Sequence, residues 1–177
     1  MLLTCVLVSF ICLIVRAEFE AGYYWLDYSG GPISENCLKL DVNSDVYVGQ
    51  VYKKPYELLP ASVRIQSPLA TGNAYDVTYT SNKYVKIVCS QFPENFKWVR
   101  TNFSKYLSVP NLVPSGEEVG IPAYIGRAYE NGKPYLGKLG KVLVYPVGTK
   151  AKYTSGPFDV LTYTKPEYDN CGVICPR

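Results

Sequence analysis

The chain of 177 residues contains no histidine, so the side chain that most often moves protons near neutral pH is absent. This excludes a histidine-dependent nucleophilic triad, and zinc or haem held by imidazole. The sequence also lacks a phosphate-binding glycine loop and a nucleophile motif. Its polar chemistry rests on 17 tyrosines, 18 Lys and Arg residues, and 15 Asp and Glu residues. We therefore expect a binding protein and not an enzyme, with no catalytic residue, metal or cofactor.

Cysteines are the other residues that could do chemistry, and four of the six lie beyond an apolar leader. Cys37, Cys89, Cys171 and Cys175 are an even number, which favours disulfides in an oxidising compartment. Three pairings are open, and we favour Cys37–Cys89 within the first half and Cys171–Cys175 as a small terminal loop. A zinc site built from all four thiolates is the alternative, disfavoured because the chain has no Cys-x-x-Cys pair.

The first 17 residues predict a secretory signal peptide. Leu2–Val15 is almost wholly apolar, and Val15 and Ala17 place small residues where a signal peptidase reads them. We expect cleavage after Ala17 and a secreted, extracellular protein. A membrane anchor is the alternative, but Arg16 ends the run before the roughly 20 apolar residues that a membrane span needs. No later stretch predicts a membrane span.

The remaining 177 − 17 = 160 residues are enough for one domain with a real core. The net charge of +3 comes without a long basic run, so we expect no nucleic-acid partner. Asn102 begins the sequon Asn-Phe-Ser, which predicts glycosylation in a secreted protein.

The strongest pattern is an internal duplication. Tyr47–Tyr52 returns as Tyr124–Tyr129, an offset of 124 − 47 = 77, and the offset holds without a gap from Tyr47–Ile65 onto Tyr124–Val142. The two tryptophans, Trp25 and Trp98, precede the two motifs. Duplication sets the architecture before any single residue is interpreted, and each half serves as a control for the other.

Strands must position these motifs. Runs rich in Val, Tyr, Thr and Ile predict strands over Asp45–Tyr52, Ala74–Thr80, Lys83–Cys89, Lys141–Tyr145 and Phe158–Tyr163. No window after the leader has an apolar stripe at helical spacing. Asn131-Gly132 predicts a tight hairpin turn, whereas the first half has Lys53-Lys54-Pro55 there.

The predicted fold is therefore all-β, with two intertwined tandem repeats of short antiparallel strands forming one pseudo-twofold domain. Each repeat would be marginal alone, and the join lacks a flexible Gly/Ser linker. We expect the signal peptide at residues 1–17, the first, degenerate repeat at 18–93 and the second repeat at 94–164. A cysteine-containing tail follows at 165–177.

The second half resembles the DM-nine repeat family. The matching pattern is Trp98-Val99, Val113-Pro114-Ser115-Gly116-Glu117, Tyr124-Ile125-Gly126-Arg127-Ala128, Asn131-Gly132, Leu136-Gly137-Lys138 and Phe158-Asp159-Val160-Leu161. The first half departs from it, with Gln50 in place of the family's Arg and Leu59-Pro60-Ala61 in place of Pro-Gly-Lys. The resemblance implies an intertwined two-repeat β fold and sugar binding. Family members include mannose-type lectins, the amino-terminal part of natterin-like toxins and pathogen-responsive salivary proteins.

In the lectins, an acidic residue and the Pro-Gly-Lys lysine hydrogen-bond sugar hydroxyls. The resemblance places the lysine on Lys138 and the acidic residue on Glu117, with Glu118 as a rival; in the first repeat the lysine position falls on Ala61. Arg127, in the core motif, is a third sugar-binding candidate, or else pairs across strands. A carboxylate, an ammonium and a tyrosine ring together suit a sugar's hydroxyls and C–H face.

The sequence thus favours a secreted lectin-like protein of innate immunity that binds mannose-type glycans on microbial or host surfaces. A symmetric homodimer would supply the several weak sites that useful binding needs. The alternative is a secreted salivary or venom-like protein-interaction factor that kept the fold and lost the sugar. Pore formation of the natterin-like kind is disfavoured, because only Thr164–Arg177 follows the second repeat.

Overall fold

The computed structural model describes residues 22–75 and 77–166. These residues form short antiparallel strands and two 3₁₀ turns. The strands of the first half are β1 (Tyr24–Asp27), β2 (Val46–Lys53), β3 (Glu57–Arg64), β4 (Ala70–Ala74), β5 (Val77–Ser81) and β6 (Lys86–Cys89). The second half contains η1 (Pro93–Asn95), β7 (Phe96–Thr101), η2 (Tyr106–Ser108), β8 (Pro114–Glu118), β9 (Ile121–Glu130), β10 (Lys133–Leu139), β11 (Leu143–Val147), β12 (Lys150–Thr154) and β13 (Phe158–Tyr163).

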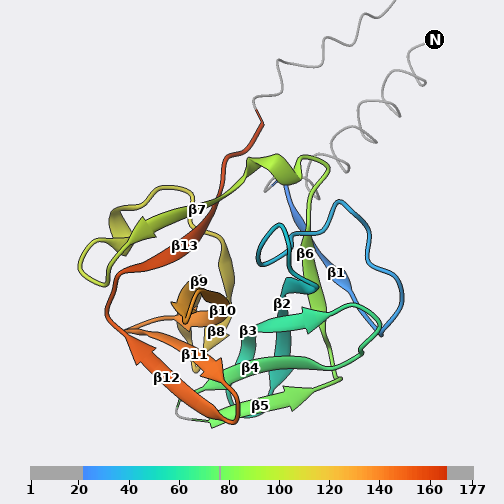
Figure 1. Cartoon of the computed structure of the whole chain (residues 1–177), viewed down its shortest axis with the longest axis horizontal. Coiled ribbons are helices and arrows are strands. Elements are labelled where there is room, and N and C mark those ends of the chain that lie inside the picture. Colours follow the sequence, from blue (N-terminus) through green and yellow to red (C-terminus); the bar gives the residue numbers. More distant parts are fainter. Residues whose placement is uncertain (1–21, 76, 167–177) are drawn as a thin grey trace, which may run out of the picture.

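The order of the strands shows the duplication directly. The sheet runs β1-β6-β2-β3-β4-β5-β12-β11-β10-β9-β13-β7, and β8 pairs with β9 off this path. Each strand of the first half has a counterpart at the mirrored place in the second, so the order is a palindrome centred on the β5–β12 pair. Figure 1 places β1, β2 and β6 on one side of the molecule and β7 and β13 on the other. The predicted all-β fold with two intertwined repeats and a pseudo-twofold is confirmed.

The apolar core is divided in the same way. One cluster is built by the first half alone and includes Val51, Leu59 and Ile87. A second belongs to the second half and includes Leu139 and Phe158. A third cluster draws on both halves, and it combines Leu40, Val48 and Val88 with Phe96, Val113, Ile125, Leu136, Leu161 and Tyr163. The shared cluster makes the two repeats one folding unit, because each half buries apolar surface against the other.

The structure corrects several predicted strands: β6 begins at Lys86 and not at Lys83, and β11 begins at Leu143 and not at Lys141. We also predicted a continuous strand over Ala74–Thr80, but β4 ends at Ala74 and β5 begins at Val77. Tyr75 lies at the turn between them with a left-handed φ of 48°. The error arose because an alternating pattern does not reveal a turn made by residues that are themselves typical of strands. The prediction over Phe158–Tyr163 matches β13 residue for residue.

The turns of the two central hairpins differ in length by one residue, and this difference changes which residues of the two repeats are equivalent. Asn131 and Gly132 form the two-residue turn between β9 and β10, with φ of 51° and 74°, the positive values of a type I′ turn. The first-half hairpin has three residues, 54–56, between β2 and β3. The gapless offset of 77 therefore fails beyond this turn. Lys138 pairs with Ile125, and the counterpart of Ile125, Val48, pairs with Ser62.

The position equivalent to Lys138 is consequently Ser62 and not Ala61, as the sequence offset predicted. Ala61 corresponds instead to Gly137, because Gly49 pairs with Ala61 and Gly126 pairs with Gly137.

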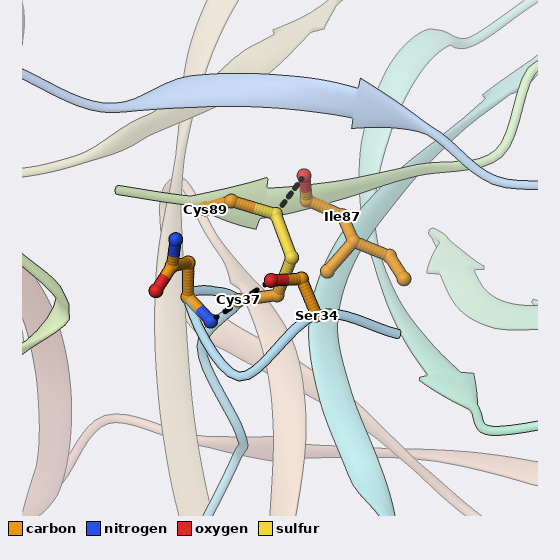
Figure 2. Close-up of a disulfide and its surroundings, with 5 residues drawn as sticks. Ser34, Cys37, Ile87 and Cys89 are labelled. Carbon is orange, nitrogen blue, oxygen red and sulfur yellow. Dashed lines mark hydrogen bonds between the residues drawn. A yellow bond between two sulfur atoms is a disulfide. The ribbon is translucent and has the colours of Figure 1, made fainter. Parts of the chain in front are cut away.

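A disulfide joins Cys37 to Cys89, the pairing that the sequence favoured. Figure 2 shows the bridge between the loop that precedes β2 and the end of β6. A zinc site built from four thiolates is incompatible with this bond. Cys171, Cys175 and the signal peptide lie outside the described residues. Within residues 22–75 and 77–166, no helix is long and apolar enough to cross a membrane.

Candidate functional site

The candidate site is organised by a nearly buried ion pair. Lys138 lies on β10, and its side chain is only 6% exposed. Its Nζ forms a salt bridge with Oε2 of Glu118, which ends β8 and has a side chain 17% exposed. Burying two charges costs solvation energy, so a pair this enclosed requires good contacts on its remaining donors and acceptors.

Two tyrosines of the first repeat complete the surroundings of this pair. Tyr75 lies in the turn between β4 and β5, and the centre of its ring is 5.5 Å from the Lys138 ammonium. Tyr79, on β5, is buried, and burial together with the negative charge of Glu118 raises the pKa of its phenol well above the usual value of 10.0. The phenol therefore stays protonated and remains a hydrogen-bond donor. The site thus combines charges from one repeat with aromatic residues from the other.

Three buried polar atoms, on β4, β5 and β8, have no hydrogen-bond partner among the described residues. They are Oε1 of Glu118, Oη of Tyr79 and Oδ1 of Asn73, which lies on β4 two residues before Tyr75. Buried polar atoms in folded proteins are almost always paired, so each unpaired atom calls for an explanation. A polar ligand or ordered water that enters the site would supply the missing hydrogen bonds.

The sequence-predicted residues do not all meet here. The structure pairs Lys138 with Glu118, the rival, while Glu117 is exposed and lines a separate pocket. Neighbouring residues of a strand point to opposite faces, so only one of the two glutamates can reach Lys138. Tyr75 and Tyr79 were missed. No local motif marks them, since they reach the site only through the packing of one repeat on the other.

Arg127 lies in another cluster and is 9% exposed. Its Nε and Nη2 both donate to Oδ2 of Asp159, on the adjacent strand β13, at 3.1 and 2.8 Å. Nη1 donates to the backbone oxygen of Leu40 at 2.8 Å. The guanidinium also stacks over Trp98 and Tyr129, 4.3 and 5.3 Å from the ring centres. This is the cross-strand pairing that the sequence predicts as the alternative role of Arg127.

The glycosylation sequon follows β7. Asn102 is half-buried, and its side-chain oxygen accepts a hydrogen bond from Ser104 Oγ at 2.8 Å. Ser104 is exposed, so the sequon lies at the surface. Within residues 22–75 and 77–166, no group of three or more Cys, Asp or Glu residues is arranged to hold a metal ion.

Comparison with known proteins decides the family. The family model of the DM9 repeat matches residues 41–154, which is 154 − 41 + 1 = 114 of the 177 residues. The chain belongs to the DM9 repeat family. The comparison with curated proteins gave no match.

Among solved structures, this DM9 protein is similar to the crystal structure of the nematode sperm cell motility protein MFP2B, with a TM-score of 0.59 and 15% identity. The similarity covers 84% of this chain and 47% of that one, so this chain spans about half the length of the nematode protein. At this identity, the likeness concerns the fold.

The two DM9 repeats differ at the candidate site. Ser62 stands at the place of Lys138, and it lines a cavity of about 370 Å³ together with Thr71 and Pro146. Lys138 pairs with Val144 on β11, and its counterpart Ser62 pairs with Thr71 on β4, so Val144 and Thr71 are counterparts. Two residues further along these strands, Pro146 is the counterpart of Asn73. The first repeat therefore offers hydroxyls where the second offers a buried ion pair.

Proposed function

We propose that this DM9 protein binds mannose-type glycans through the site around Glu118 and Lys138, as a secreted, non-enzymatic recognition protein. The observation that carries the proposal is the buried ion pair whose neighbourhood contains polar atoms without a hydrogen-bond partner among the described residues. Vicinal sugar hydroxyls donate and accept at the same time, so they match a mixed set of donors and acceptors.

Each group has a distinct role in this proposal. Glu118 Oε1 accepts a hydrogen bond from one hydroxyl, and Lys138 Nζ donates to its neighbour. Hydrogen bonds to charged groups are roughly twice as strong as neutral ones, which suits a site this small. Tyr75 is 56% exposed, so its ring offers an open apolar surface to the C–H face of the sugar. Glu117 and Arg127, the other candidates from the sequence, lie apart from this group, and the proposal gives them no contact with the sugar.

Titration calorimetry with mannose tests the proposal. The informative variant is Lys138→Met combined with Glu118→Gln, which removes both charges and leaves no unpaired buried charge behind. Ser62→Ala is the matched control, because Ser62 occupies the equivalent position in the first repeat. We expect saturable heat at a stoichiometry near one, lost in the double variant and kept in the control. Binding that survives the double variant would contradict this assignment of the site.

Secretion and assembly are part of the same proposal. The disulfide between Cys37 and Cys89 suits an oxidising compartment, which supports secretion. Mass spectrometry of protein from eukaryotic culture medium should find an amino terminus at Glu18. A symmetric homodimer would place two weak sites on one particle and raise avidity for a glycan surface. Light scattering distinguishes a dimer from a monomer.

The runner-up function is a secreted protein-interaction factor that kept the fold without the sugar. The specific observation in its favour is that Lys138 and Glu118 are already paired with each other and are largely closed to solvent. Absence of heat with mannose, together with capture of a protein partner that mannose does not displace, would favour this function over the lectin.

A further inference from the structure

A second pocket is lined by residues of the first repeat together with Gly116 and Glu117 of β8, and neither Glu118 nor Lys138 lines it. It has a volume of about 740 Å³, within the range of small-molecule sites. Two tyrosines, two lysines and two glutamates line it: Tyr52, Tyr84, Lys54, Lys86, Glu57 and Glu117. We propose that this pocket binds a carboxylated pyranose, that is, the acidic sugar unit of a glycan, with its carboxylate on Lys86 and its ring against the tyrosines.

The second repeat explains why the pocket exists. Arg127 of β9 pairs with Asp159 of β13, and at the equivalent place in the first repeat Gln50 of β2 pairs with Lys86 of β6. Gln50 is therefore the counterpart of Arg127, and Lys86 is the counterpart of Asp159. By the same correspondence, Tyr52 is the counterpart of Tyr129. In the second repeat the guanidinium of Arg127 covers the Tyr129 ring and reaches Asp159. In the first repeat the shorter Gln50 takes the place of that guanidinium.

The substitution at the partner position sets the charge of the ligand. Asp159 presents a carboxylate to a cation, whereas its counterpart Lys86 presents an ammonium. A ligand group that meets Lys86 is therefore expected to be an anion. Lys86 Nζ lies 2.9 Å from Oδ1 of Asp27, whose side chain is 84% exposed. Exposed ion pairs of this kind contribute little, so a ligand carboxylate can displace Asp27.

The aromatic residues favour a sugar ring over a simple anion. The rings of Tyr52 and Tyr84 are 5.9 Å apart and nearly perpendicular, at 88°, so they form a corner. The C–H face of a pyranose packs against such a surface, while Glu57 and Glu117 can accept hydrogen bonds from its hydroxyls. Lys54 adds a second positive charge. The mixture of charges suits a ligand with one anionic group and several hydroxyls.

Tyr84 gives an independent reason to assign a binding role. Its side chain is 71% exposed, and its φ is 53°, in the left-handed region that a bulky residue adopts at a cost. An exposed ring on a strained backbone adds little to folding. Glycine would fit this backbone better, so Tyr84→Gly removes the ring without endangering the fold.

The test compares methyl glucuronide with methyl glucoside, which differ only in the carboxylate, by saturation-transfer NMR and titration on the full secreted chain. We expect the glucuronide to bind about tenfold tighter than the glucoside. Tyr84→Gly and Lys86→Gln should each weaken glucuronide binding about tenfold, and Tyr84→Gly should leave the thermal midpoint unchanged or raised. Asp27→Asn should tighten binding, because it removes the competing carboxylate.

Equal binding of the two glycosides would overturn the proposal, as would unchanged binding in Lys86→Gln. Tighter binding of a sulfated glucoside than of the glucuronide would overturn the assignment of a carboxylate. The Lys138→Met and Glu118→Gln double variant should retain glucuronide binding. The same double variant is expected to lose mannose binding. A result that contradicts the mannose site can therefore be distinguished from a result that contradicts the glucuronide pocket.

Discussion

At the scale of single residues, the chain uses its few buried charges in two different ways. Each of the three guanidinium nitrogens of Arg127 donates a hydrogen bond, and Asp159 is held on its other side by Arg100 Nη1 at 3.1 Å. Lys138 and Glu118 are also buried, but polar atoms around them lack partners among the described residues. The first arrangement is typical of a structural cluster, and the second of a site that receives a ligand.

This contrast predicts that Arg127 is needed for stability. Arg127→Met should lower the free energy of unfolding by about 3 kcal/mol, because it removes the buried cation that is paired with the buried Asp159 carboxylate. Combining it with Asp159→Leu should recover part of the loss. Arg64→Met is the control, since the Arg64–Asp45 pair is 62% exposed on both sides and should cost less than about 1 kcal/mol. Urea denaturation measures all three, and equal costs for Arg127→Met and Arg64→Met would contradict the structural role.

A second prediction at this scale concerns pH. Tyr145 Oη donates to Oε1 of Glu130 at 2.7 Å, and this hydrogen bond, with the Lys152 ammonium, holds the pKa of Glu130 below its usual 4.5. Glu130 therefore adds stability that is fully present above pH 4.5 and is lost as the pH falls through its lowered folded-state pKa. The pKa of Tyr145 is raised to about 12, so the phenol keeps its proton throughout this window.

Tyr145→Phe should consequently raise the pKa of Glu130, as followed by NMR titration of its carboxyl carbon. The thermal midpoints of the variant and the parent should differ more at neutral pH than in acid below the Glu130 titration. A difference that does not change with pH would mean that the hydroxyl acts through packing and not through Glu130.

At the scale of elements, hairpin length decides how the two repeats correspond. The two-residue turn at Asn131-Gly132 and the three-residue turn at 54–56 shift β10 and β3 by one residue relative to each other. A one-residue shift turns every side chain of a strand to the other face. The turn therefore determines that Ser62, and not Ala61, is the first-repeat counterpart of Lys138.

The turn itself predicts a matched pair of glycine variants. Gly132 has a φ of 74° and open space around the position of a Cβ atom, so Gly132→Ala should cost about 1 kcal/mol through backbone strain alone. Gly140 also has open space, but its φ lies outside the left-handed region, so Gly140→Ala should be neutral or slightly stabilising. Chemical denaturation compares the two. Equal effects would show that backbone conformation at Gly132 is not what sets its cost.

The sequence predicted the strands and the fold class well, and the site only in part. Runs of β-branched and aromatic residues identified β13 and most of β2, because those strands are buried on both faces and carry few polar side chains. The break after Ala74 was missed, since Tyr75 carries no turn signal. Lys138 was identified through family resemblance. Tyr79 could not be found, because it reaches Glu118 only across the interface between repeats, which no local pattern encodes.

At the scale of the whole molecule, the repeats are joined by contacts that neither could make alone. The core cluster that contains Val48 and Val88 also contains Ile125 and Leu161, their counterparts. The hydroxyl of Tyr163, at the end of the second repeat, donates to the backbone oxygen of Gly22 at 2.7 Å and lies 2.9 Å from Ser90 Oγ. The candidate site follows the same plan, with Tyr75 from the first repeat and Lys138 from the second.

This interdependence predicts that neither proposed repeat folds by itself. Residues 18–93 and 94–164, of 93 − 18 + 1 = 76 and 164 − 94 + 1 = 71 residues, should each lack a cooperative unfolding transition, because each would expose its part of the shared core. Mixing the two should restore a cooperative transition through the β5–β12 pairing and the central cluster. Calorimetry of each half and of the mixture is the measurement. A half that unfolds cooperatively alone would show that the DM9 repeat is a self-sufficient domain, and the candidate site would then lie between two domains and not inside one.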